Sequence, residues 1–124
     1  MKKIGIIFIL MLIFCQLSLS LSCFFPYYEI SENKVFYTSV NGRILVKNVD
    51  IESFVKIDFE FAKDKKNVYY TGKVLSNIDV NTFEIVTKLP WRTGCHYSEI
   101  ESFKDKNGIY QIEDIRKGTL KLTD

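Results

Sequence analysis

The feature that most limits the fold of this chain is a short pattern that recurs three times after residue 30. Each copy is an asparagine followed by β-branched and aromatic residues, and the copies begin at Asn33, Asn67 and Asn107. Asparagine favours tight turns, while valine, tyrosine and phenylalanine favour strands. The copies are 34 and 40 residues apart. Spacings of this size are typical of one supersecondary unit repeated along a chain.

A second pattern recurs with the first. An acidic residue is followed by serine or threonine three positions later and by phenylalanine four positions later, at residues 50–54, 79–83 and 99–103. A carboxylate at the start of such a segment accepts hydrogen bonds from backbone N–H groups just ahead of it. We therefore expect each copy to form a single capped turn that directs Phe54, Phe83 or Phe103 into the core.

The middle copy of the first pattern carries a family resemblance. Residues 63–73 read Lys-Asp-Lys-Lys-Asn-Val-Tyr-Tyr-Thr-Gly-Lys, residues 104–111 read Lys-Asp-Lys-Asn-Gly-Ile-Tyr-Gln, and residues 33–37 keep only the asparagine and the strand. This resembles the DKNYY repeat proteins of bacteria, with one extra lysine in the middle copy, over about residues 31–117. The resemblance implies a scaffold found in exported proteins. It implies no catalytic or binding residue.

The rest of the sequence predicts a mainly β fold. Asn41-Gly42 lies between residues 34–40 and 43–49, which predicts a hairpin with a type I′ turn. Thr71-Gly72 and Asn107-Gly108 predict two more hairpins. Residues 54–61 alternate apolar with polar side chains and residues 84–88 are β-branched, so both predict strands, while residues 90–94 predict a loop. We expect a meandering antiparallel sheet of repeated hairpins with short capped turns, preceded by an N-terminal hydrophobic signal helix.

The N-terminus has the outline of a secretory signal. Lys2 and Lys3 precede an apolar run, and Ser20 and Ser22 are small residues at the first and third positions before a cut at residue 23. The organisation predicted is a signal peptide at 1–22, a short tether at 23–30 and a repeat domain at 31–124. The rival interpretation is an uncleaved membrane anchor, since a spanning helix needs about 20 apolar residues. Removal of residues 1–22 leaves 15 basic and 15 acidic residues, so no basic surface argues for nucleic acid.

Two cysteines remain after cleavage, and they allow two chemistries. Ser-Leu-Ser-Cys at residues 20–23 resembles a lipobox, although leucine stands one position later than usual, which makes Cys23 a candidate for lipidation. Without acylation, Cys23 and Cys95 are candidates for one disulfide in an oxidising compartment. A disulfide that closes a loop of about 70 residues stabilises a fold by about 4 kcal/mol. The two uses of Cys23 exclude each other.

No catalytic, cofactor or metal site is predicted. Cys95 and His96 adjoin, but neighbours on a strand face opposite ways, and a single histidine with two thiols makes no persuasive zinc set. The repeated tyrosines are interpreted as core residues rather than an exposed platform. Trp91 and Arg92, in the predicted loop, are the candidate contact residues.

The function predicted is that of an exported, non-enzymatic cell-envelope protein, membrane-anchored or secreted, with an interaction or structural role. Its partner would be an unidentified protein or glycan of the envelope, with membrane contact through a lipid anchor as an option and no nucleic acid. The alternative is a secreted hydrolase or thiol enzyme with a site around Cys95 and His96, which requires a concave pocket that brings these residues to an acid.

Overall fold

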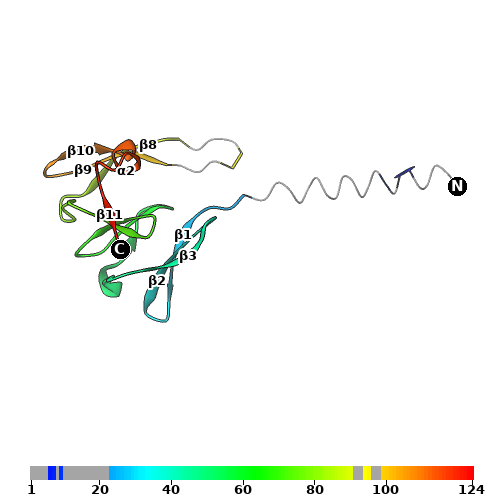
Figure 1. Ribbon diagram of the computed structural model, residues 1–124, viewed down its shortest axis with the longest axis horizontal. Coiled ribbons are helices and arrows are strands. Elements are labelled where there is room, and N and C mark those ends of the chain that lie inside the picture. The colour runs from blue at the N-terminus through cyan, green and yellow to red at the C-terminus, as the bar shows by residue number, and fades with distance from the viewer. Residues whose placement is uncertain (1–5, 8, 10–22, 91–93, 96–98) are drawn as a thin grey trace.

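The computed structural model describes residues 6–7, 9, 23–90, 94–95 and 99–124, and these residues form a mainly β domain. The strands make three antiparallel sheets, with orders β1-β2-β3, β11-β7-β6-β5-β4 and β10-β9-β8. Figure 1 shows the β8–β10 sheet and the β1–β3 sheet at opposite ends of the domain, with the five-stranded sheet between them. The mainly β prediction is confirmed, whereas the single meandering sheet is wrong.

The first sheet begins earlier than expected. Its strands are β1 (Tyr27–Ser31), β2 (Lys34–Ser39) and β3 (Gly42–Val46). Strand β1 lies mostly in the segment expected to be a tether, and its Tyr28 is buried. Glu32 and Asn33 join β1 to β2 with φ values of 51° and 60°, the conformation of a type I′ turn. The first asparagine of the repeat therefore closes a hairpin that the sequence analysis did not predict.

The hairpin at Asn41-Gly42 is confirmed, but its turn differs from the prediction. Ser39 pairs with Gly42, so the loop consists of Val40 and Asn41. Neither of these has a positive φ, whereas Gly42 has φ 118°. The glycine thus follows the loop instead of lying within it, and the type I′ turn predicted here is wrong.

The five-stranded sheet carries the middle copy of the repeat. It contains β4 (Val55–Lys56), β5 (Phe61–Lys63), β6 (Val68–Tyr70), β7 (Lys73–Leu75) and β11 (Leu122–Thr123). The predicted hairpin around Thr71-Gly72 is present, with φ values of 50° and 82° that fit a type I′ turn. The single strand predicted over residues 54–61 is wrong. Asp58 Oδ1 accepts from the Glu60 and Phe61 N–H groups and folds the segment into the β4–β5 hairpin.

The third sheet consists of β8 (Glu84–Lys88), β9 (Ile100–Asp105) and β10 (Gly108–Gln111). Strand β8 matches the prediction, and the hairpin at Asn107-Gly108 is present. The third capped turn is wrong, because residues 99–103 lie mostly in β9. A short helix, α2 (Ile112–Arg116), follows β10 and buries Ile112 and Ile115.

Aromatic side chains fill both clusters of the core. The larger cluster gathers Phe61, Phe83 and Phe103 with ring centroids 5.5 to 6.1 Å apart. The smaller cluster contains Tyr28, Tyr37 and Tyr69, with Phe54 packed against it. Of the phenylalanines predicted to enter the core, Phe83 and Phe103 are buried, and Phe54 is half-buried against the smaller cluster. Among the tyrosines of the repeats, Tyr37, Tyr69 and Tyr70 are buried and Tyr110 is half-buried, so they serve the core.

The predicted signal peptide lies almost entirely outside the described residues. Among the residues that the structure describes, no helix is long and apolar enough to cross a membrane. The signal helix and its cleavage site therefore stay predictions.

Candidate functional site

The repeat signature has a structural role, which centres on Asp64. Its carboxylate accepts hydrogen bonds from the N–H groups of Asp50 at 2.9 Å, Lys66 at 2.7 Å and Asn67 at 2.7 Å, and from the Tyr69 hydroxyl at 2.6 Å. Burial raises the pKa of this carboxyl, but these hydrogen bonds outweigh burial and hold the pKa below its ordinary value. A buried, fully bonded carboxylate of this kind fixes two loops to each other.

The same arrangement occurs a second time around Asp105. The Asp105 carboxylate accepts from the N–H groups of Asp79 at 2.9 Å and Asn107 at 2.8 Å. Thr82 donates to Asp79 and accepts from the Lys106 N–H at 2.8 Å. The two sequence patterns are therefore halves of one unit, in which a capped turn binds an Asp-Lys turn through backbone hydrogen bonds.

The first unit has the equivalent contacts. Ser53 donates to Asp50 and accepts from the Lys65 N–H at 2.9 Å. Each unit thus uses its acidic and hydroxyl side chains for internal hydrogen bonds. These residues explain the signature and stabilise the fold, and their polar groups are used within the domain.

Cys23 and Cys95 form a disulfide whose Cα atoms are 5.3 Å apart. The bond joins the chain just before β1 to the connection between β8 and β9. Trp91 and Arg92, the candidate contact residues, and His96 lie outside the described residues. The structure therefore brings the two predicted cysteines together and says nothing of the other three.

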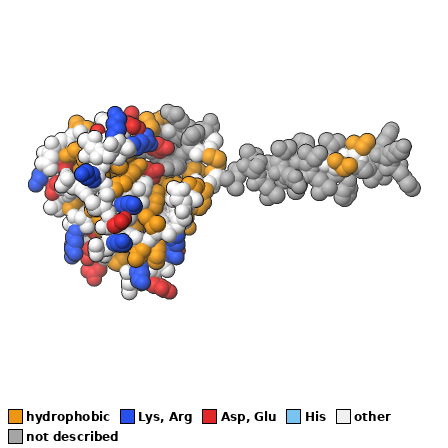
Figure 2. Space-filling view, in the orientation of Figure 1, with side chains coloured by type: hydrophobic (Ala, Val, Ile, Leu, Met, Phe, Trp, Pro, Cys, Tyr) orange, Lys and Arg blue, Asp and Glu red, His pale blue; other side chains and the backbone are white. Residues whose placement is uncertain are grey.

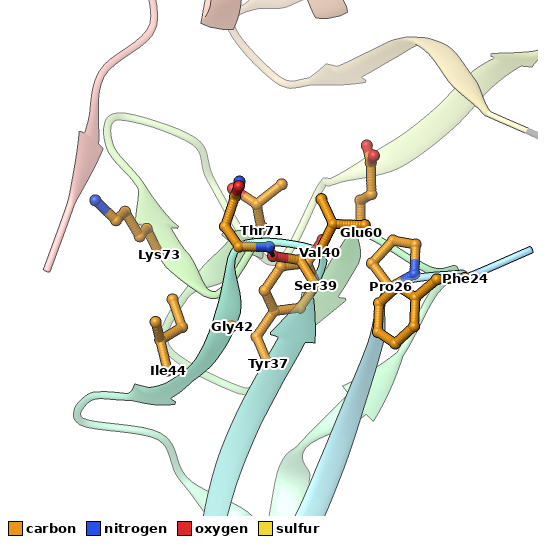
Figure 3. Close-up of a pocket in the computed structure, with 11 residues that line it drawn as sticks. Phe24, Pro26, Tyr37, Ser39, Val40, Gly42, Ile44, Glu60, Thr71 and Lys73 are labelled. Carbon is orange, nitrogen blue, oxygen red and sulfur yellow. Dashed lines mark hydrogen bonds between the residues drawn. The ribbon is translucent and has the colours of Figure 1, made fainter.

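An open cavity of about 610 Å³ lies beside the disulfide-linked segment (Figure 3). Phe24 and Pro26 form one wall, and Ile44 and Lys73 lie at the opposite end, with Tyr37 between them. The remaining lining residues come from the β2–β3 loop and the five-stranded sheet: Ser39, Val40, Asn41, Gly42, Glu60 and Thr71. Val40 is 80% exposed and Phe24 is 49% exposed, so apolar surface faces solvent here.

A second cavity of about 400 Å³ continues the first along β3. Ile44 and Lys73 line both cavities. The second cavity is also lined by Leu45, Lys47, Gly72 and Val74. Thr123 and Asp124 complete its lining. We call the two cavities together the β3 groove. Figure 2 shows hydrophobic side chains gathered in the middle of one face of the domain, with charged side chains around them.

The floor of the groove is held by close contacts between two sheets. A Cβ on Gly72 would lie 2.8 Å from both Ile44 Cδ1 and Tyr37 Cβ, so this turn requires glycine. The Tyr28 hydroxyl donates to the Glu60 carbonyl at 2.6 Å and accepts from the Gly72 N–H at 3.1 Å. Burial raises the pKa of Tyr28 and of Tyr37, so both hydroxyls stay neutral at physiological pH. The groove is therefore built on a fixed floor.

The chemistry of the groove suits binding. Its lining combines apolar and aromatic side chains with polar ones, and its charged residues are Lys47, Lys73, Glu60 and Asp124. Among the described residues, no group of three or more His, Cys, Asp or Glu side chains is placed to hold a metal ion. Such a surface selects a ligand by shape, apolar contact and charge.

Sequence reasoning missed the residues of this groove. Phe24 and Pro26 belong to the expected tether, and the strand predicted over residues 34–40 includes Val40, which instead lies in the hairpin loop. The one available signal was Val40 itself, since an aliphatic residue directly before Asn-Gly is an unusual choice for an exposed turn.

The comparisons with known proteins give one match. The sequence profile of the DKNYY family matches residues 7–115. No curated protein and no solved structure matches the chain. The matched region covers most of the sequence and includes both interlocked units, so this chain belongs to the DKNYY family.

Proposed function

We propose that this protein is exported and acts by binding a partner outside the cytoplasm, without catalysing a reaction. The observation that carries the proposal is the β3 groove, an open and largely apolar surface with exposed Val40 and Phe24 on a fixed floor. Exposed apolar side chains gathered in a groove mark interaction sites on soluble domains.

The disulfide supports export. Disulfides form and persist in secreted and envelope proteins and are rare in the cytosol. Cys23 lies directly after the predicted cleavage site, and its bond to Cys95 uses the thiol that lipidation would require. We therefore propose that Cys23 is not acylated and that residues 1–22 are a cleaved signal peptide.

The disulfide also supports a binding role. Phe24 and Pro26, which follow the bonded Cys23, form one wall of the groove. The bond thus holds that wall against the domain. A bonded Cys95 has no thiolate to act as a nucleophile, so the thiol-enzyme alternative would first require reduction of the bond.

The proposal is tested by photo-crosslinking in the native host. A photoreactive phenylalanine analogue replaces Val40 in the groove, and in a matched control it replaces Ile109, which is 66% exposed on the distant β10. We expect a discrete crosslinked adduct from position 40 and none from position 109. Equal labelling at both positions, or none at position 40, would contradict a binding role for the groove.

A further inference from the structure

The outer edge of β3 carries backbone N–H and C=O groups that no strand of the described residues pairs with. Ser39 and Gly42 flank a two-residue loop, so they exchange hydrogen bonds, and antiparallel pairing then alternates along the ladder. Tyr37 with Ile44 forms the next bonded pair. The N–H and C=O groups of Arg43 and Leu45 consequently point away from β2. The sheet ends at β3, and among the described residues no strand pairs with that edge.

The groove runs along this same edge. Ile44 and Leu45 line it from β3, while Lys73 and Val74 line it from β7. The edge therefore offers backbone partners next to side-chain pockets, which is the arrangement that allows a peptide to add as an extra strand.

Charge decides what kind of strand fits. Arg43 and Lys47 lie two positions to either side of Leu45, and both are exposed. The Arg43 guanidinium stacks on Phe36 of β2 at 3.7 Å and lies 3.5 Å from the Glu29 carboxylate of β1, so it reaches across the sheet, in an exposed ion pair of the kind that contributes little to stability. Lys47 has no ion-pair partner among the described residues, and Lys73 approaches Asp124 at 3.8 Å with both side chains exposed. Along β3 the apolar Leu45 thus lies between two basic residues, Lys47 and an Arg43 that is shared with Glu29.

A second copy of β3 does not satisfy this edge. Antiparallel pairing centred on Leu45 would place Arg43 of each copy opposite Lys47 of the other, and in-register parallel pairing would place like charges together. Like charges directly opposite across strands are destabilising. An extended peptide with an apolar centre and acidic residues two positions to either side puts opposite charges at both ends.

We infer that β3 accepts an extended acidic peptide as a fourth strand of the β1-β2-β3 sheet, with its apolar side chains in the β3 groove. This inference rests on the proposed function and names the partner of the same groove. The backbone of the edge supplies affinity, and Arg43 with Lys47 supplies selectivity for acidic segments.

The test uses a fluorescent peptide with the central sequence Glu-Val-Leu-Val-Glu and a matched Lys-Val-Leu-Val-Lys peptide. The sequence is the same in both directions, so it serves parallel and antiparallel pairing equally. With the purified full chain, we expect the acidic peptide to bind at least about ten-fold more tightly than the basic one. Equal binding of the two, or no binding of the acidic peptide, overturns the inference.

Backbone pairing is tested separately from charge. Two versions of the acidic peptide are N-methylated at alternate residues, one set at the valines and the other at the leucine and glutamates. In a strand, the N–H groups of alternate residues point to the same neighbouring strand. One version should therefore lose binding and the other should keep it. Retention of binding by both versions overturns strand addition.

Leu45→Pro tests the edge from the protein side. Proline removes the N–H that points away from β2 and leaves the β2–β3 bonds in place. Ile109→Pro is the matched control. The β9–β10 hairpin also has a two-residue loop, and by the same alternation the Ile109 N–H points away from β9. We expect L45P to weaken acidic-peptide binding at least about ten-fold and I109P to leave it unchanged. Equal effects of the two variants, each shown to be folded by its urea midpoint, overturn the inference.

The position-40 crosslink, measured in L45P, separates strand addition at β3 from binding at the groove as a whole. If the position-40 crosslink persists in L45P and the peptide does not bind, the groove has a partner that does not pair with β3. If the crosslink is also absent, the groove itself has no binding role. Self-association that L45P abolishes would show that a second copy occupies the edge, and this too overturns the acidic-peptide assignment.

Discussion

Single carboxylates carry much of the specificity of this fold, and Asp64 is the clearest case. Its two oxygens accept four hydrogen bonds from three backbone groups and one tyrosine. An asparagine in its place keeps the shape but turns one acceptor into a donor, so it leaves buried N–H or O–H groups without a partner. Unsatisfied buried groups are among the largest sources of mutational destabilisation.

Asp64→Asn should therefore lower the free energy of unfolding by about 2 kcal/mol or more. Urea denaturation at neutral pH measures this change. Asp124→Asn is the control, because Asp124 is exposed and its contact with Lys73 is 3.8 Å long, and it should change stability by less than about 0.5 kcal/mol. A small effect of D64N would mean that the interlocked turns contribute little to the fold.

The same carboxylates set the acid sensitivity of the protein. Asp64 and Asp105 have pKa values below the ordinary one, because hydrogen bonds to the charged form outweigh burial. A depressed folded-state pKa gives stability that is present above the unfolded-state value, near about 4, and is lost as the pH falls through the folded-state value. Asp58, whose pKa is raised by burial, contributes in the opposite direction.

We expect the free energy of unfolding to be nearly constant from pH 7 to 5 and to fall below about pH 4. Denaturation series at several pH values measure the slope. The slope below pH 4 should be shallower in D64N than in the parent protein. A parent protein that gains stability on acidification would contradict these assignments.

At the scale of elements, the interlocked turn is the repeated unit of the chain. The Ser53 hydroxyl accepts a hydrogen bond from the Lys65 N–H and donates one to Asp50. The Thr82 hydroxyl makes the same two contacts with the Lys106 N–H and Asp79. One hydroxyl therefore joins the two sequence patterns in each unit.

Ser53→Ala should lower the free energy of unfolding by about 1 to 2 kcal/mol, because it removes a hydrogen bond from the cap and leaves the Lys65 N–H without its acceptor. Ser53→Thr, which places the hydroxyl as Thr82 does in the second unit, should retain most of the stability. Thermal unfolding followed by circular dichroism compares the two variants. Equal losses in both would show that the hydroxyl is not what the position requires.

The sequence predicted elements where local chemistry decides them. The hairpins at Asn41-Gly42, Thr71-Gly72 and Asn107-Gly108 and strand β8 follow from turn residues and β-branched runs. Prediction from the sequence was wrong where two local signals competed. Residues 54–61 have the alternation of a strand, but the Asp58 carboxylate captures two N–H groups and turns the chain back.

The false third turn has a similar cause. Residues 99–103 have the same sequence pattern as the capped turns. In the structure, however, Ser102 and Phe103 are buried in β9, directly before the Asp105 turn. By position they correspond to β5, which leads into the Asp64 turn. Neighbours in space, which a local pattern does not contain, decide between the two conformations. The β3 groove was unpredictable for the same reason, because it forms between separate sheets.

At the scale of the whole molecule, the Cys23–Cys95 disulfide closes a segment with a sequence separation of 72 and so links the start of the domain to its β8–β9 connection. It also holds Phe24 and Pro26 at the groove. The bond therefore couples overall stability to the shape of the β3 groove.

Reduction of the bond, or a Cys23→Ser and Cys95→Ser double variant, should lower the free energy of unfolding by about 2 to 4 kcal/mol. It should also weaken peptide binding at the groove, because the Phe24 wall is released. Urea denaturation with and without reductant, together with the peptide titration, measures both effects. Unchanged stability on reduction would mean that the ends are held by other contacts.

The most direct test of the central claim, an exported domain with Cys23 bonded to Cys95, is the intact mass of the protein from its native host with and without reduction. We predict a chain that begins at Cys23, carries no acyl group and gains two hydrogens on reduction. A Cys23 that carries a diacylglyceryl group, or a chain that retains residues 1–22, would contradict the account.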